Sequence, residues 1–207
     1  MKVLLINGSP HEKGCTYTAL SLIAGELKAQ GIETEILHVG GQPVGGCIGC
    51  GGCRKTGDGC VFGGVVNEAI EKAKTADAFV FGSPVHYASA AGNMASFMDR
   101  LAYAGGKYLA YKPAAVCCSA RRAGTTSTLD QLVKYPQFFH MPLVNGSYWA
   151  MVHGSNPEQV LQDAEGCAVM QELGRNMAWL LRCIEAGKAA GIDHPQNPPR
   201  PMTNFIR

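Results

Sequence analysis

Short runs of apolar residues alternate along the chain with segments in which apolar residues recur every three or four positions. Runs of the first kind are typical of strands buried on both faces, and the second spacing is typical of helices that cover a sheet. The pattern predicts strands at 3–6, 32–39, 78–81, 114–118 and 143–152. It predicts helices at 16–30, 65–75, 93–104, 126–135 and 156–186.

Strands that alternate with helices in this order indicate an α/β fold. We expect a flavodoxin-like, doubly wound, five-stranded parallel sheet with helices on both faces. One domain is expected over 1–186, with a cysteine-rich loop at 45–60. The remaining segment, 187–207, carries four prolines and is expected to be an extended tail that frays or packs across a partner subunit.

The net charge and the lengths of the apolar stretches argue against nucleic-acid binding, a membrane span and a signal peptide. The formal net charge is +2 and no run of Lys or Arg is present, so nucleic-acid binding is not indicated. No apolar stretch has the length of a membrane span. The apolar run after Met1 stops at Asn7, too early for the core of a signal peptide, so we expect a cytoplasmic protein.

The first strand is followed by a loop, 8–16, that opens a helix. Backbone N–H groups and the helix dipole at such a position suit a phosphate group. The loop lacks the G-x-G-x-x-G fingerprint and, because Cys15 follows Gly14, it also lacks a Walker A motif. An ordinary turn between a strand and a helix remains the alternative at this point.

Two further loops follow the third and fourth strands, at 82–89 and 119–124. In a sheet whose strand order reverses between the first and third strands, all three loops meet at one crevice. Tyr87 is suited to pack against a flat ring there.

These loops carry a resemblance to a known family. Segments 4–16, 82–87 with 97–100, and 119–124 resemble the phosphate loop, the flavin-ring loop with its following helix, and the third loop of the NADPH-dependent FMN reductases. The resemblance implies FMN as cofactor and NAD(P)H as a donor. It departs at Cys15, where many members have Asn, and we expect Cys15 to be a small packing residue.

The resemblance also implies roles for individual residues. Those that would hold the phosphate are Ser9, His11, Thr16 and Thr18. Those that would border the flavin ring are Pro84, Val85 and Tyr87 on one side, and Ser119, Arg121 and Gly124 on the other. No catalytic residue of the chain is expected, because the flavin carries the chemistry.

Four of the nine cysteines lie in one glycine-rich segment, as Cys47-x2-Cys50-x2-Cys53-x6-Cys60. Compact thiolates of this spacing favour a [4Fe–4S] cluster. A zinc ion, which more often takes two separated pairs, and free thiols are the alternatives. The motif resembles that of the iron–sulfur flavoproteins, which place a [4Fe–4S] cluster near FMN.

The remaining cysteines are expected to have structural roles. Cys117 and Cys118 are expected in the core, and Cys167 and Cys183 are expected to be packing residues on the last helix. Tyr148 and Trp149 are likewise expected to be buried beneath that helix.

Two functions stay open. The first is an FMN-dependent oxidoreductase that passes electrons from NAD(P)H or a reduced carrier to a small acceptor such as a flavin or quinone. The second is an electron carrier that takes electrons from ferredoxin through the cluster, without strong small-molecule turnover. A protein of this fold that binds no flavin is a third reading. A homodimer or homotetramer is expected.

Overall fold

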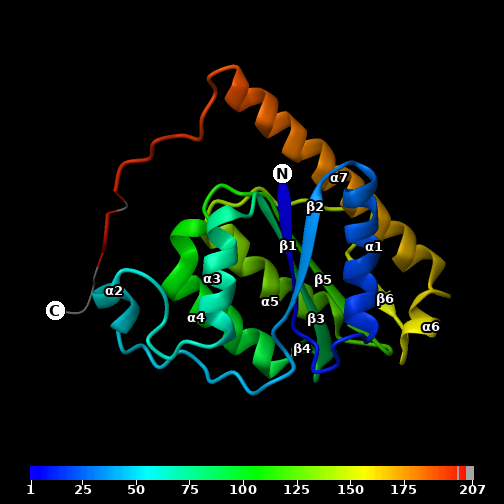
Figure 1. Ribbon diagram of the computed structural model, residues 1–207. Helices are drawn as coiled ribbons and strands as arrows, with labels where there is room; N and C mark the ends of the chain where they lie inside the picture. Colours follow the sequence, from blue (N-terminus) through cyan, green and yellow to red (C-terminus); the bar gives the residue numbers. More distant parts are fainter. Residues whose placement is uncertain (200, 204–207) are drawn as a thin grey trace.

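The computed structural model describes residues 1–199 and 201–203. Within them, the sheet has five parallel strands in the order β2-β1-β3-β5-β6, and a sixth, β4, pairs antiparallel with the end of β3 (Figure 1). The strands are β1 Lys2–Asn7, β2 Glu33–His38, β3 Ala78–His86, β4 Ser89–Ala90, β5 Ala114–Ala120 and β6 Met151–His153. The predicted flavodoxin-like parallel sheet is confirmed, with β4 as its one addition.

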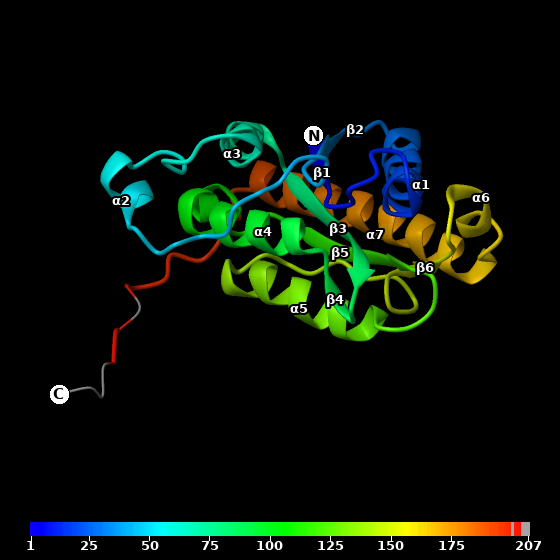
Figure 2. The same ribbon diagram turned by 90° about the horizontal axis from the view of Figure 1, so that it is seen from below.

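Helices cover both faces of this sheet. The helices α1 and α7 lie on one face and α3, α4 and α5 on the other, as the two views at right angles show (Figures 1 and 2). The helices are α1 Cys15–Ala29, α2 Gly52–Thr56, α3 Val65–Thr75, α4 Gly92–Gly105, α5 Thr125–Phe138, α6 Pro157–Val160 and α7 Ala164–Ala189, with a short 3-10 helix at Gly106–Tyr108. Each face therefore has its own core.

The central strands divide their side chains between these two cores. In β1, Val3 and Leu5 point to the α1 and α7 face, whereas Leu4 and Ile6 point to the α3 and α4 face. All four are at most 1% exposed, which explains why the strand reads as a continuous apolar run rather than an alternating one.

On the first face, α7 crosses α1 closely at Gly174. A Cβ atom at this position would lie 2.8 Å from both the Ile23 carbonyl oxygen and the Glu26 Cβ. Glycine is required because the two helix backbones leave no space for a side chain.

The predicted fifth strand was wrong in extent. Only Met151–His153 pairs with β5, and Leu143 forms one isolated bridge to Ala114. The intervening Asn145-Gly146-Ser147 turns away and bonds to α7 instead: Ser147 N donates to the Glu172 carboxylate (2.7 Å). Turn-forming residues inside an apolar run thus ended the strand.

The predicted last helix was also wrong, because it is two helices. Asn156 caps α6, its side chain accepting the Gln159 amide (2.9 Å). Asp163 then caps α7 by accepting from Gly166 N (3.0 Å), which starts a new helix axis.

The helix α7 continues to Ala189, three residues into the segment predicted as tail. Beyond it, the His194 ring stacks on Tyr111 with centroids 4.4 Å apart, and Asn197 Nδ2 donates to the Tyr111 hydroxyl (2.7 Å). Residues 200 and 204–207 of the predicted tail lie outside the described residues. Within the described residues, no helix combines the length and apolar character needed to cross a bilayer.

Candidate functional site

The loops that follow β1, β3 and β5 meet at the carboxyl edge of the sheet. The amide of Gly8 donates to the Gly82 carbonyl (2.9 Å), which joins the first loop to the carboxyl half of β3. The hydroxyls of Thr16 and Ser119 are hydrogen-bonded at 2.8 Å and both residues are buried, which joins the first loop to the third. The order β2-β1-β3 places the reversal of strand order beside β1, where ligands of such sheets bind.

The fully buried Asn7 organises the first loop. Its Nδ2 donates to the Glu12 carbonyl (2.9 Å), and its Oδ1 accepts the Ser9 amide (3.1 Å). The loop is therefore closed by one side chain from the end of β1. Sequence reasoning missed Asn7, although Asn followed by Gly-Ser-Pro is a recognisable turn signal.

Several hydrogen-bond donors remain available to an anion in this loop. Ser9 Oγ accepts the His11 amide (3.1 Å), which leaves its own hydrogen to donate. One hydroxyl of the Thr16–Ser119 pair donates to the other, so the pair also retains one donor. Among the described residues, no side chain caps the N-terminus of α1 at Gly14, so the first amides of the helix are free to face this position.

The predicted phosphate residues are thus not equivalent. Ser9 and Thr16 lie buried in the loop, and His11 is exposed at its rim. The Thr18 hydroxyl is engaged with the Gly14 carbonyl (3.2 Å) one turn into the helix.

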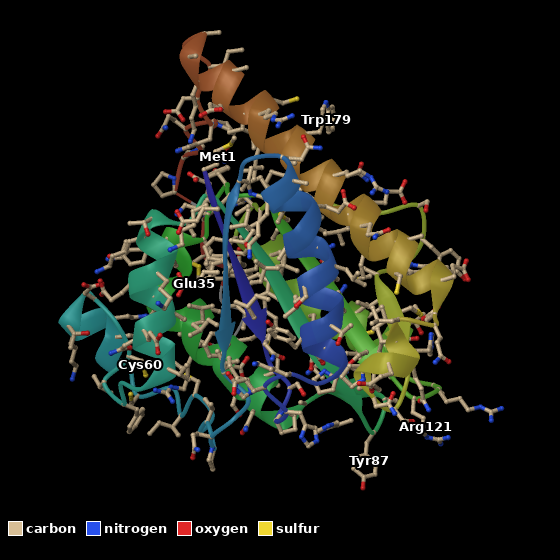
Figure 3. All side chains as sticks on the ribbon, turned by 45° about the vertical axis from the view of Figure 1, so that its right-hand side comes forward. Met1, Glu35, Cys60, Tyr87, Arg121 and Trp179 are labelled. Carbon is tan, nitrogen blue, oxygen red and sulfur yellow. The ribbon has the colours of Figure 1, made fainter. Side chains whose placement is uncertain are left out.

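The second loop ends in a strained hairpin turn between β3 and β4. Tyr87 and Ala88 both have positive φ, at 50° and 58°, the pattern of a type I′ turn that glycine and asparagine usually fill. The Tyr87 side chain is fully exposed and projects from the carboxyl edge (Figure 3). Strain of this kind is often retained for function.

The third loop lies against the second. A Cβ atom at Gly124 would be 2.7 Å from Ala88 Cα and 2.9 Å from Val85 Cγ1, so the two loops touch. Pro84 pairs with Ser119 across β3 and β5. Arg121 is exposed and also extends from this edge (Figure 3). All ten predicted flavin residues therefore lie at the carboxyl ends of β3 and β5, in the loops that follow the strands, or in the first turn of α1.

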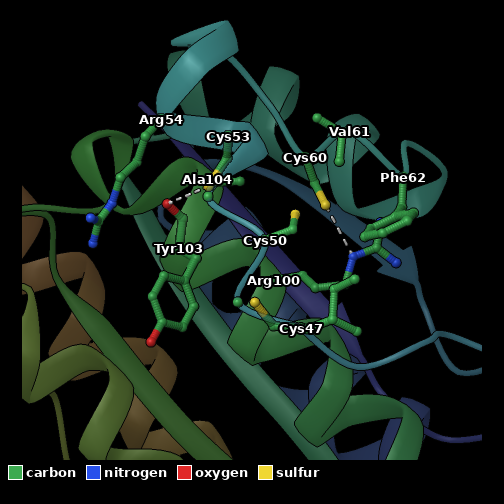
Figure 4. A pocket seen from close by; sticks show the side chains of 13 residues that line it. Cys47, Cys50, Cys53, Arg54, Cys60, Val61, Phe62, Arg100, Tyr103 and Ala104 are labelled. Carbon is green, nitrogen blue, oxygen red and sulfur yellow. Dashed lines mark hydrogen bonds between the residues drawn. The ribbon is translucent and has the colours of Figure 1, made fainter.

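The four-cysteine segment forms a second site, beside the C-terminal half of α4. A cavity of about 220 Å³ opens there, and all four predicted thiols line it (Figure 4). The other side chains around it come chiefly from α2, α4 and the residues after Cys60, and include Arg54, Phe62, Arg100 and Tyr103.

Two of the four cysteines are held by the rest of the fold. Cys60 is fixed by the Asn67 side chain, whose Oδ1 accepts the Cys60 amide (2.7 Å) and whose Nδ2 donates to the Cys60 carbonyl (3.0 Å). Cys53 lies on α2, and its thiol donates to the Tyr103 carbonyl (3.6 Å). Cys47 and Cys50 are exposed, on backbone without helix or strand.

Among the described residues, no group of three or more His, Cys, Asp or Glu side chains is arranged to hold a single metal ion. A four-iron cluster has a different requirement, since each thiolate binds a different iron and the sulfur atoms surround the cluster. Four thiols around one cavity, with two arginines and no carboxylate among its lining residues, fit an anionic cluster.

The other cysteines serve the fold, with one exception. Cys117 and Cys118 are buried as predicted, and burial raises the pKa of Cys118 to about 12. Burial also raises the pKa of Cys15, whose thiol donates to the Gly154 carbonyl (3.5 Å). Cys183 is exposed, so its predicted packing role was wrong.

The aromatic pair before β6 is also a correction. Tyr148 and Trp149 are 52% and 59% exposed and touch edge to face, with ring centroids 4.8 Å apart. They are not buried under α7, because their segment leaves the sheet at the 145–147 turn.

Comparison with known proteins agrees with this geometry. The family model of the NADPH-dependent FMN reductases matches residues 1–156. An iron-sulfur flavoprotein of Methanocaldococcus jannaschii is 28% identical over 193 residues, which cover 89% of this chain and 100% of that protein.

Two solved structures share the fold. A flavodoxin from the domain Archaea aligns over 88% of this chain and 99% of its own, with a TM-score of 0.59 and 14% identity. RosB, solved with 8-demethyl-8-formylriboflavin-5'-phosphate bound, aligns over 100% of this chain and 96% of its own, with a TM-score of 0.68 and 15% identity. At these identities the likeness concerns the fold.

Proposed function

The chain belongs to the NADPH-dependent FMN reductase family, and we propose that it is an oxidoreductase that holds FMN at the three loops of the carboxyl edge. The observation that carries this proposal is the buried contact between Thr16 and Ser119, beside Ser9 and the uncapped start of α1. Hydroxyl donors and free helix amides at one point suit a phosphate without a neutralising Lys or Arg.

Within this site the residues have distinct tasks. Ser9, Thr16 and the first amides of α1 bind the phosphate, while His11 and Thr18 border it. Pro84, Val85 and Gly124 offer a narrow wall for the flavin ring, because the second and third loops touch at Gly124. Tyr87 and Arg121 stand at the open rim, where a donor or an acceptor approaches.

When bound, FMN would supply the redox chemistry, which covers transfer of two electrons together as a hydride or of one electron at a time. A reduced nicotinamide gives two electrons and one proton; a quinone or flavin acceptor takes two electrons and two protons, the second proton coming from water. The chain binds and orients the partners. The described site needs no acid or base of its own for this exchange.

We propose further that Cys47, Cys50, Cys53 and Cys60 hold a [4Fe–4S] cluster, which supplies one-electron transfer. The curated relative named as an iron-sulfur flavoprotein, aligned over its whole length, supports this assignment. It also favours the second candidate function, an electron carrier that takes electrons from ferredoxin. A homodimer or homotetramer would be the working unit.

One spectrum tests the cofactor assignment. Protein purified and reconstituted without oxygen should show flavin bands together with the broad absorption of iron and sulfide. Thr16→Val should bind FMN about tenfold more weakly, whereas Thr75→Val, which removes an exposed hydroxyl that donates to the Lys72 carbonyl on α3, should bind FMN as the wild type does. Colourless protein after incubation with FMN would overturn the proposal and favour the flavin-less reading.

Anaerobic mixing with NADH or NADPH separates the two functions. Bleaching of the flavin within seconds supports the reductase. Bleaching by reduced ferredoxin but by neither nucleotide supports the electron carrier and overturns nicotinamide dependence.

A further inference from the structure

Arg100 is the most deeply buried charged side chain at the cysteine cavity. It is 7% exposed and extends from α4 into the cavity wall (Figure 4). Its Nε donates to Cys60 Sγ (3.3 Å), its Nη2 to the Gly63 carbonyl (2.8 Å) and its Nη1 to the Gly45 carbonyl (3.4 Å).

These contacts leave the positive charge of Arg100 without a counter-charge. Its partners are two carbonyls, a thiol and the ring of Phe62, which lies 5.8 Å from the guanidinium carbon. None of the ion pairs among the described residues includes Arg100, and no Asp or Glu lines the cavity. A buried charge is costly unless an opposite charge accompanies it.

The proposed ligand would supply that charge. Four thiolates outnumber the positive charge of an oxidised [4Fe–4S] core, so the bound cluster is anionic and becomes more so on reduction. A nearby fixed cation favours the more negative, reduced form.

We infer that Arg100 is a positioning residue that balances the charge of the cysteine-bound cluster and raises its reduction potential through Cys60. This inference rests on the proposed function. The same fork clamps both ends of the motif, because Gly45 precedes Cys47 and Gly63 follows Cys60. Only Arg presents donors in a rigid planar fork that reaches three such points; Lys supplies the charge alone.

The test compares three variants of the reconstituted protein by anaerobic redox titration with dithionite. R100Q should shift the reduction equilibrium of the cluster about tenfold toward the oxidised form, which is about 59 mV for one electron. R100K should recover most of that shift. R54Q, a control at the exposed arginine of the same cavity, should shift the equilibrium by less than about twofold, because solvent screens its charge.

Iron content and FMN content are measured beside the potential. Loss of iron from R100Q alone, with FMN and the thermal midpoint unchanged and iron retained by R100K, also supports the charge role. Equal potentials in wild type and R100Q, or equal iron loss from R100Q and R100K, overturn it. Wild-type protein that holds FMN but no iron after reconstitution overturns the cluster assignment itself, and this inference with it.

Discussion

The carboxyl-edge loops and the cysteine segment are held in place by different kinds of contact. At the carboxyl edge, the loops leave regular parallel strands, and their contacts are short backbone and hydroxyl bonds such as Gly8 to Gly82 and Thr16 to Ser119. In the cysteine segment the backbone is mostly irregular. Side chains from neighbouring helices hold it: Arg100 of α4 donates to the Gly45 and Gly63 carbonyls, and Asn67 of α3 bonds to Cys60.

This difference has a physical basis. At the proposed FMN site, the flavin ring and phosphate would be bound by shape and by fixed donors, which a sheet edge provides before any ligand arrives. The proposed iron–sulfur cluster would form bonds to its thiolates and help to order them, so the chain would need only to anchor part of the loop beforehand. Cys53 and Cys60 are anchored, whereas Cys47 and Cys50 are left exposed.

The largest expected effect comes from adding one methyl group beside the first carboxyl-edge loop, at Gly40 after β2, and one at the start of the cysteine segment, at Gly45. In Gly40→Ala, the new Cβ would overlap the Ser9 backbone, so the first loop must move; we expect a loss of about 3 kcal/mol in the free energy of unfolding. In Gly45→Ala no atom of the described residues lies within 4 Å of the new Cβ, and we expect the free energy of unfolding to change by less than about 0.5 kcal/mol. Urea unfolding measures both, and equal losses would contradict the comparison.

A second prediction is that a substitution in one region weakens binding of that region's cofactor alone. Asn67→Ala removes both hydrogen bonds to Cys60, each worth about 1 kcal/mol, so iron per chain should fall while FMN affinity stays constant. Thr16→Val should do the reverse, weakening FMN about tenfold with iron unchanged. Fluorescence titration of FMN and an iron assay check it; loss of both cofactors in both variants would mean that the regions are not independent.

The sequence was informative where one local rule decides the structure. The buried strand β1 and the helix α3 follow directly from apolar runs and helical spacing, because regular backbone imposes its period on the side chains. The three loops follow from the order of strands. The short β6 depends on the bond from Ser147 to Glu172, which lies 25 residues further along the chain. The break before α7 depends on the bond from Gly166 to Asp163 across a turn. Neither bond is visible in the spacing of apolar residues.

The candidate sites divide in the same way. The cysteine motif and Thr16 were found from spacing and from the position of a loop. Arg100 was not found as a cavity residue, because an arginine on an amphipathic helix reads as surface. Its burial depends on a segment some forty residues earlier folding over α4, which only the tertiary structure shows.

The smallest expected effect concerns Asp58, which follows α2 and anchors the cysteine segment by charge. Its carboxylate accepts from Lys74 Nζ (3.0 Å) and from the Tyr108 hydroxyl (3.1 Å), and these bonds, Lys74 first, hold the pKa of Asp58 below its usual value. A lowered pKa means that the stabilisation is present above the ordinary carboxyl pKa and is lost as the pH falls through the pKa of the folded state.

The wild type should therefore melt at a slightly higher temperature than Asp58→Asn at pH 7, and the two melting midpoints should converge toward pH 3. Because the pair is exposed the difference is small and shrinks with added salt. Asp130→Asn, which removes an exposed carboxylate on α5, is the control and should melt with the wild type at pH 7. A difference between the wild type and Asp58→Asn that grows on acidification would show that the charge of Asp58 does not anchor this segment.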